Sequence, residues 1–246
     1  MSGVLYVVSV PIGNLEDITL RASRILSEVD WIACEDTRRT GKLLELLGIG
    51  RRRLVSVHDH NESERGPKLI RALEAGEDIA LVSDAGTPTI SDPGYRLVSQ
   101  VIESGQSVVP IPGVSAAITA LSTSGLPTDQ FRFVGFPSSK PTTLKKELAA
   151  LSGAAETLIF YVGPHHLERF LGHAEAAFGS NRPIVVAREL TKKFEEFRRG
   201  TLGELRKEPG TIRGEMVILV GGAPPEEAPS SEDLRAVVLR CLEEGY

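Results

Sequence analysis

Short apolar runs alternate with amphipathic segments along the first half of the chain. The runs have the length of buried strands and predict five of them, at residues 5–10, 31–34, 54–57, 79–82 and 108–111. The segments between them carry apolar residues at helical spacing and predict helices at residues 18–29, 39–47, 68–75, 95–104 and 114–124. Strict alternation of apolar strands and helices indicates a parallel sheet covered by helices on both faces.

The second half follows a different order, which begins after Gly125, Leu126 and Pro127. Strands are predicted at residues 131–135, 157–161, 184–187, 195–201 and 216–220, and helices at residues 143–151, 166–178 and 202–207. The last strands lie close together in sequence, which favours an antiparallel pair. We therefore predict an α/β protein with an open, doubly wound parallel sheet in a domain at residues 1–124 and a mixed sheet in a domain at residues 125–223. Residues 224–246 are predicted to form a linker and a short helix.

Composition is ordinary for a globular protein, with 246 residues, 41% hydrophobic and 25% charged. The two cysteines, Cys34 and Cys241, suggest neither a disulfide framework nor a zinc ligand set. No apolar run approaches the roughly 20 residues of a membrane span, and the amino terminus does not have the pattern of a signal peptide. We therefore expect a cytoplasmic protein without a membrane partner.

Net charge is −5, which argues against bulk binding to nucleic acid, but the charge is unevenly distributed. Residues 224–246 contain six acids and two arginines, so the rest of the chain is nearly neutral. Basic residues concentrate at 38–53 and 188–207. These stretches could bind phosphates. The more common role of such charges is to form solvated surface.

Polar and glycine-containing loops follow four of the predicted parallel strands. They cover residues 11–14, 35–38, 83–94 and 112–116. Because the carboxyl ends of parallel strands meet at one edge of a sheet, these loops would form a small-molecule cleft there. Each loop alone could be an ordinary turn. The twelve residues of 83–94, however, exceed the usual two to six of such a connection.

Several common chemistries lack their motifs in this chain. It has no P-loop, no G-x-G-x-x-G after the first strand, no H-E-x-x-H and no paired C-x-x-C. His58 and His60 flank Asp59, but this alternation is equally a strand end meeting solvent. We predict no metal site.

The loop motifs resemble the signature of the ribosomal RNA small subunit methyltransferase I family, which belongs to the tetrapyrrole methylase superfamily. The matching motifs are VPIGNLEDIT at residues 10–19, EDTR at 35–38, SDAGTPTISDPG at 83–94 and PGVSA at 112–116. The resemblance implies a homodimer of two α/β domains with the tetrapyrrole methylase fold. It also implies S-adenosylmethionine as cofactor and, as substrate, the ribose 2′-hydroxyl of a cytidine in the 16S rRNA of the small ribosomal subunit.

The same resemblance implies a set of site residues. Those matching cofactor-contacting positions are Pro11, Asp84, Gly86, Thr87, Ile90, Ser115, Ala116, Val162 and Leu190.

Methylation of a hydroxyl needs alignment and removal of a proton. The candidate bases are Glu35, Asp36 and Glu189, with Asp92 and Asn14 as further polar possibilities. Arg38, Lys140 and Lys192 could hold phosphates or stabilise a developing alkoxide. For Glu35 and Asp36, a structural ion pair with Arg38 or Arg39 remains the alternative.

Two departures from the family pattern leave other functions open. The family's Phe-Tyr-Glu-Ser-Pro-His-Arg segment reads Phe-Tyr-Val-Gly-Pro-His-His at residues 160–166, and residues 142–146 contain no arginine. A basic C-terminal extension that we associate with the family is also missing after Glu244. The alternatives are a methyltransferase acting on a tetrapyrrole precursor and a noncatalytic relative that binds RNA or a ligand.

The basic stretch at residues 38–53 generates a first prediction. Replacing Arg51 and Arg52 together by alanine should weaken RNA binding, because counterion release is lost with each phosphate contact, while cofactor affinity stays intact. Filter binding to RNA and calorimetry with the cofactor measure the two affinities separately. Equal loss of both would contradict a phosphate-binding role.

Overall fold

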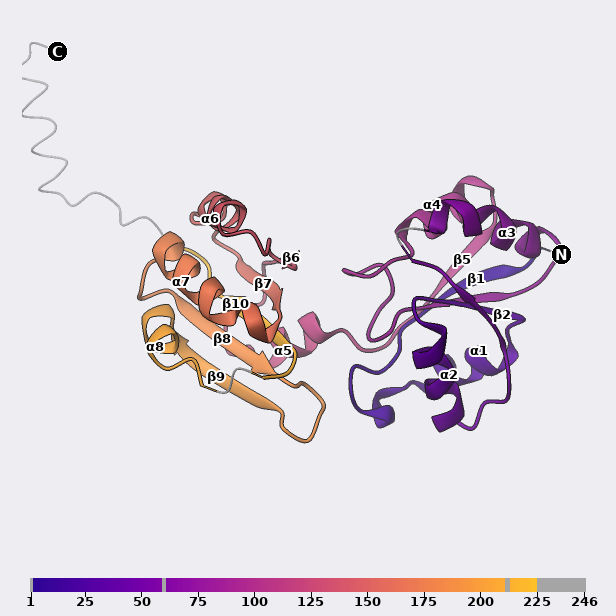
Figure 1. Cartoon of the computed structure of the whole chain (residues 1–246), viewed down its shortest axis with the longest axis horizontal. Helices are drawn as coiled ribbons and strands as arrows, with labels where there is room; N and C mark the ends of the chain where they lie inside the picture. Colours follow the sequence, from indigo (N-terminus) through magenta and orange to yellow (C-terminus); the bar gives the residue numbers. More distant parts are fainter. Residues whose placement is uncertain (1, 59–60, 211–212, 225–246) are drawn as a thin grey trace, which may run out of the picture.

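The first lobe of the molecule contains a five-stranded parallel sheet (Figure 1). The computed structural model describes residues 2–58, 61–210 and 213–224. The strands of this sheet are β1 (Val4–Val8), β2 (Trp31–Cys34), β3 (Arg53–Ser56), β4 (Ile79–Val82) and β5 (Ser107–Ile111). Their order is β3-β2-β4-β1-β5, and every neighbouring pair is parallel. The doubly wound sheet predicted from the sequence is thereby confirmed.

Helices cover both faces of this sheet because its strands are apolar on both sides. Val8, Ile32 and Val82 pack with α1 (Leu20–Glu28) and α2 (Thr37–Leu46). The alternating residues Leu5 and Leu81 pack with α3 (Glu62–Glu74) and α4 (Tyr95–Glu103) on the opposite face. A short 3₁₀ helix, η1 (Leu15–Asp17), lies between β1 and α1. Since side chains alternate across a strand, each strand supplies two cores.

The second lobe contains a mixed five-stranded sheet, as predicted. Its strands are β6 (Phe131–Gly135), β7 (Thr157–Val162), β8 (Pro183–Arg188), β9 (Glu196–Thr201) and β10 (Met216–Val220). Their order is β6-β7-β10-β8-β9; β6 and β7 are parallel, and the other pairs are antiparallel. The last strand within the described residues is therefore the central strand of the sheet.

Both faces of the second sheet are also covered. On one face lie α6 (Pro141–Ala150), α7 (Leu167–Phe178) and α8 (Leu202–Lys207), with η2 (Pro164–His166) leading into α7. On the other face lies α5 (Ala116–Ser124), whose Ala117, Ala120 and Leu121 contact β7, β8 and β10. A domain boundary at residue 124 would separate α5 from the sheet on which it packs. The packing favours the loop between β5 and α5 as the place where the chain changes lobes.

Observed element boundaries follow the sequence prediction closely, with one clear exception. The helix predicted at residues 68–75 begins at Glu62, so Pro67 lies inside it. A proline inside a helix costs free energy, because it removes a backbone hydrogen bond and its ring crowds the preceding turn. Here the burial of Leu69 and Leu73 against the sheet offsets this cost, so the helix continues through Pro67. The linker and short helix predicted at residues 224–246 lie, apart from Pro224, outside the described residues.

The core of the second lobe generates a stability prediction. Phe160 on β7 is fully buried, and its ring lies edge-on to Phe170 with the ring centroids 5.1 Å apart. Phe160→Ala should lower the free energy of unfolding by about 3–5 kcal/mol, because it removes buried surface and leaves a cavity. Urea denaturation measures this loss. The matched control is Phe131→Ala on β6, where the ring is 44% exposed; a similar loss there would contradict the explanation.

Candidate active site

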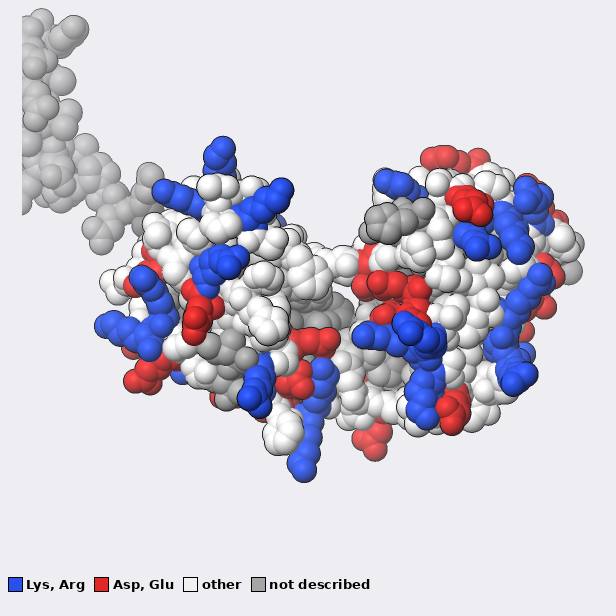
Figure 2. All heavy atoms as spheres, viewed as in Figure 1, with Lys and Arg blue, Asp and Glu red and all other residues white. Residues whose placement is uncertain are grey.

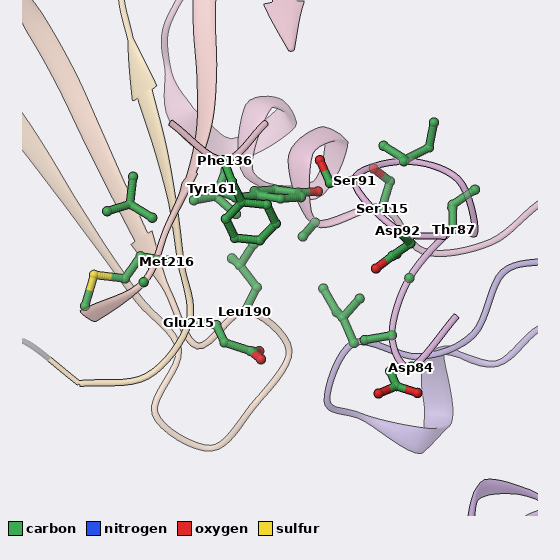
Figure 3. A pocket seen from close by; sticks show the side chains of 18 of the residues that line it. Asp84, Thr87, Ser91, Asp92, Ser115, Phe136, Tyr161, Leu190, Glu215 and Met216 are labelled. Carbon is green, nitrogen blue, oxygen red and sulfur yellow. The ribbon is translucent and has the colours of Figure 1, made fainter. Parts of the chain in front are cut away.

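A cavity of about 380 Å³ lies where the two lobes face each other (Figure 3). The first lobe contributes residues from all four loops that follow β1, β2, β4 and β5, among them Ile12, Glu35, Asp84 and Ser115. The second lobe contributes β7, the start of β10 and Leu190. Its volume is in the range of sites that take a small molecule.

The long loop after β4 is held by backbone and side-chain hydrogen bonds. Val10 and Gly86 exchange two backbone hydrogen bonds, 2.8 and 3.0 Å long, which attach the loop to the end of β1. The Thr87 hydroxyl donates to the Val114 carbonyl at 3.0 Å and lies 2.9 Å from the Ser9 hydroxyl. Thr87 therefore joins three loops, and its hydroxyl positions the cavity wall.

Backbone strain concentrates in two loops. The only non-glycine residues with positive φ among those described are Thr89 (72°) and Ser91 (63°) in the β4–α4 loop, and Glu189 (51°) and Thr191 (66°) in the β8–β9 loop. Such conformations cost free energy and cluster at functional sites. Both loops line the cavity, through Ile90 and Leu190 among others.

Acidic side chains dominate the charge of the cavity. Glu35, Asp84, Asp92 and Glu215 line it, together with a single base, Arg39. Figure 2 shows acidic side chains gathered where the lobes face each other. Two of these carboxylates are paired, since Arg39 Nη1 lies 3.3 Å from Asp84 Oδ2 and Lys192 Nζ, outside the lining, lies 2.8 Å from Glu215 Oε2. The remaining excess of negative charge favours a cationic ligand.

Asp92 is the carboxyl group that this environment perturbs most. Burial, together with the nearby charges of Glu35 and Asp84, raises its pKa to about 6, against the opposing effect of the Ser83 side chain. A carboxyl group with this pKa is largely ionised at neutral pH and still basic enough to accept a proton. Perturbed carboxyls in clefts are typical of functional sites.

Asp36 has a structural role instead. Its carboxylate accepts the backbone N–H of Arg38 at 2.8 Å at the start of α2 and pairs with the Arg38 guanidinium at 2.7 Å. The Arg38 hydrogen bonds lower the pKa of Asp36 to about 2. A carboxylate this acidic is a poor proton acceptor, and Asp36 is not among the residues that line the cavity. The structure favours the ion pair that the sequence left open.

Glu189 and Lys192 also pair with each other rather than face the cavity. Lys192 Nζ donates to Glu189 Oε1 at 3.0 Å and to Glu215 Oε2 at 2.8 Å. The backbone N–H of Glu215 donates to the Glu189 carboxylate. This hydrogen bond is the main reason why the pKa of Glu189 is lowered. The aliphatic part of the Lys192 side chain packs against Gly13 of the first lobe. A Cβ atom added to Gly13 would lie only 2.5 Å from Lys192 Cγ.

An aromatic group forms part of the second-lobe wall. The Tyr161 ring lies edge-on to Phe133 and Phe136, with ring centroids 5.0 and 5.4 Å apart. Burial raises the pKa of the Tyr161 hydroxyl, which hydrogen-bonds the Ser115 side chain and the Ala117 backbone at the start of α5. Figure 3 shows this hydroxyl directed toward the side of the cavity that carries Ser91 and Ser115.

The structure brings most of the sequence-predicted cofactor residues together. The lining includes Asp84, Gly86, Thr87, Ile90, Ser115, Ala116, Val162 and Leu190. Pro11 is not part of it, and the next residue, Ile12, lines the cavity instead. Of the candidate bases only Glu35 lines it, and Arg38, Lys140 and Lys192 do not.

Several lining residues were missed by sequence reasoning. Tyr161, Phe136, Glu215, Met216 and Val217 all come from the second lobe. Tyr161 belongs to a predicted strand, but nothing in the sequence indicates which strand faces the other lobe. No cluster of three or more potential metal ligands occurs within the described residues, and His60 lies outside them. Among the described helices, none is long and apolar enough to cross a membrane.

Two solved structures that share this architecture are named methyltransferases. The chain is similar to uroporphyrin-III-C-methyltransferase from Thermus thermophilus, with a TM-score of 0.64, 22% identity and coverage of 90% of this chain and 95% of that one. It is also similar to the methyltransferase CobJ, with a TM-score of 0.67 and 21% identity over 90% and 95% of the two chains. At this identity the likeness concerns the fold.

Sequence comparison goes further than the fold. Residues 4–206 match the family described as Tetrapyrrole (Corrin/Porphyrin) Methylases. Ribosomal RNA small subunit methyltransferase I from Mesorhizobium japonicum is 50% identical over 93% of this chain and 77% of its own length. The proteins of that name from Escherichia coli O157:H7 and Bacillus subtilis are 48% and 49% identical, over 98% and 94% of this chain and 84% and 79% of their own lengths.

The chain belongs to the tetrapyrrole methylase family and, within it, to the branch formed by the ribosomal RNA small subunit methyltransferase I proteins.

The raised pKa of Asp92 generates a stability prediction. Because the folded state binds this proton more tightly than the unfolded chain, the associated stabilisation is complete below pH about 4 and is lost as pH rises through about 6. Asp92→Asn should therefore raise the free energy of unfolding at pH 7 by about 1–2 kcal/mol, after discounting a two-unit shift for partial exposure. Urea denaturation at pH 7 and pH 4 measures the effect.

The difference between wild type and Asp92→Asn should vanish at pH 4. As a control, Asp36→Asn should not raise stability at pH 7, because it removes the ion pair with Arg38 while the amide oxygen can still cap α2. If Asp92→Asn were less stable than the wild type at pH 7, the folded protein would not disfavour the charged form of Asp92, and the explanation would be wrong.

Proposed function

We propose that this chain transfers the methyl group of S-adenosylmethionine to the ribose 2′-hydroxyl of a cytidine in the 16S rRNA of the small ribosomal subunit. The observation that carries the proposal is the acidic cavity between the lobes, in a chain about half identical to proteins named for this rRNA subunit. The reaction needs a site for a cationic methyl donor and a base for a hydroxyl proton. The cavity offers both.

The residues present fit S-adenosylmethionine. When bound, this donor supplies a methyl group on a positively charged sulfonium. Glu35, Asp84 and Asp92 give the cavity the opposite charge. Leu190 and Val217 provide an apolar wall suited to a flat base and keep water away. Gly86, with φ of 77°, holds the wall in a conformation that side chains disfavour, and its backbone N–H and C=O pair with Val10.

Asp92 is the base that this arrangement supports best. It lines the cavity, and its pKa of about 6 matches a general base that acts near neutral pH. Its carboxylate would accept the proton of the ribose hydroxyl as that oxygen bonds the methyl carbon and the bond from this carbon to the donor sulfur breaks, leaving the electron pair on the sulfur. Glu35 lines the same cavity and is the second choice. The Tyr161 hydroxyl, held by Ser115 and Ala117, would fix the position of the facing loops.

The acidic lining also separates the proposed substrate from a tetrapyrrole precursor. A precursor with several carboxylates would meet four acids and one base in this cavity. Like charges at close range disfavour such binding. A ribose hydroxyl brings no charge of its own into the cavity, and its phosphates can stay at the rim.

We further propose that the chain acts in the cytoplasm as a homodimer. Tyr95 (72%) and Ile102 (59%) are strongly exposed on α4, and because they are seven residues apart they lie on the same face of that helix. Neighbouring exposed apolar side chains are typical of a surface that a partner covers. Sedimentation analysis of the protein gives the oligomeric state directly.

Methyl transfer should depend on pH through Asp92. The rate of transfer from labelled S-adenosylmethionine to small ribosomal subunits should fall about tenfold per pH unit below about 6, because the protonated carboxyl cannot accept a proton. Asp92→Asn should reduce the rate at pH 7.5 by about 10²- to 10⁴-fold and remove this dependence.

Two variants serve as controls. Asp36→Asn should lose less than about tenfold, since that carboxylate is paired outside the cavity. Glu35→Gln tests the second choice of base. If the fall in methyl-transfer rate at low pH disappears in Glu35→Gln but persists in Asp92→Asn, then Glu35 is the base and Asp92 is not. Free rRNA and a tetrapyrrole substrate in parallel assays separate the possible substrates.

A further inference from the structure

A second, smaller cavity adjoins the first one on the second lobe. It is lined by the β6–α6 loop, the start of η2 and α7, and it shares Phe136, Tyr161, Val162 and Gly163 with the main cavity. Its volume of about 40 Å³ leaves room for little more than a water molecule. A planar ligand would therefore lie across its mouth rather than inside it.

The charges of the two cavities are opposite. No acidic side chain among the described residues lines the smaller cavity, whereas Arg169 and His166 do. Lys140 follows directly after the lining residues Ser138 and Ser139, and its side chain is exposed. Figure 2 shows further basic side chains over the α6 end of this lobe. The main cavity therefore suits a cation, and its neighbour suits an anion.

The loop that carries these groups is held in place. Arg169 Nη1 donates to the Ser139 carbonyl at 2.9 Å, which leaves the other nitrogens of its guanidinium for a ligand. The nearest acid on α6, Glu147, accepts the backbone N–H of Ser138 at 2.9 Å. The Lys140 ammonium makes no hydrogen bond or ion pair within the described part of the chain.

An exposed aromatic ring stands between the two cavities. Phe136 is 66% exposed although it lines both of them. Its edge-on contact with Tyr161 fixes the ring and leaves much of its surface open. An exposed aromatic ring beside basic side chains is the combination with which proteins bind single-stranded nucleic acid.

The basic stretch at residues 38–53 is less available for RNA than its composition suggests. Five of its six bases already have partners. Arg38 pairs with Asp36, Arg39 with Asp84 and Lys42 with Glu45, while Arg52 donates to the Ser27 carbonyl and Arg53 stacks on Trp31. A phosphate would have to compete with these contacts, which is not so at Lys140. Of the pair Arg51 and Arg52, only Arg51 is left without such a contact among the described residues, so the structure reduces the loss of RNA affinity expected from the double replacement to the part that Arg51 contributes.

We infer that the smaller cavity is the subsite for the nucleotide next to the methylated one, with its base against Phe136 and its phosphate held by Arg169 and Lys140. This inference rests on the proposed function, because it assigns the substrate of that site as single-stranded RNA. The target ribose would then reach the main cavity from the same side. Unstacked bases held on aromatic rings are the usual mode of specific RNA recognition.

Binding of small ribosomal subunits tests the subsite independently of methyl transfer. Arg169→Gln and Lys140→Gln should each weaken binding about tenfold at moderate salt and reduce the slope of log affinity against log salt by about one. The affinity for S-adenosylmethionine, measured by calorimetry, should not change. Arg71→Gln, at an exposed arginine of α3, is the matched control and should bind as the wild type does.

The aromatic ring is tested by a separate pair of variants. Phe136→Leu should weaken subunit binding about 5- to 150-fold, the range expected for loss of one stacked base, and Phe136→Trp should retain it. The inference would be overturned if Arg169→Gln and Lys140→Gln both bound subunits as the wild type does. It would also be overturned if Phe136→Leu lost affinity for S-adenosylmethionine but not for subunits. A wild-type protein that binds subunits without methylating them would instead refute the proposed function.

Discussion

The paired backbone hydrogen bonds between Val10 and Gly86 are the contact on which the site depends. They attach the twelve-residue loop after β4 to the end of β1, at the centre of one edge of the sheet. Together with the Thr87 contacts to Val114 and Ser9, they support the loop that carries Asp84 and Asp92. With them, strained residues such as Thr89 and Ser91 are held in conformations that the loop alone would not keep.

This attachment gathers negative charge at one place, which has consequences for both stability and chemistry. The burial and like-charge repulsion that raise the pKa of Asp92 destabilise the folded state at neutral pH. The same surroundings make the group a useful base. The opposite case is Asp36, where Arg38 stabilises the charged form and removes its basicity. Two acids of the same chain, close in the fold, thus serve different purposes because their partners differ.

The second lobe explains how one fold can serve different methylations. Uroporphyrin-III-C-methyltransferase shares the architecture at about one-fifth identity, and a fold by itself does not determine the substrate. We propose that side chains around the mouth of the cavity select the substrate of this chain. An acidic main cavity adjoins a basic smaller one across Phe136, an arrangement that suits a cationic donor beside a polyanionic chain.

The sequence by itself determined the elements, both sheet types and the loops that line the first-lobe side of the cavity. This was possible because apolar periodicity is local, and because parallel strands always place their following loops at one edge. Only the tertiary structure decided that β10 lies between β7 and β8, which brings Glu215 and Met216 to the cavity. It also decided that Asp92, rather than Asp36, is the perturbed carboxyl. Strand order and the partner of each charge depend on contacts between residues far apart in the chain, which no local pattern encodes.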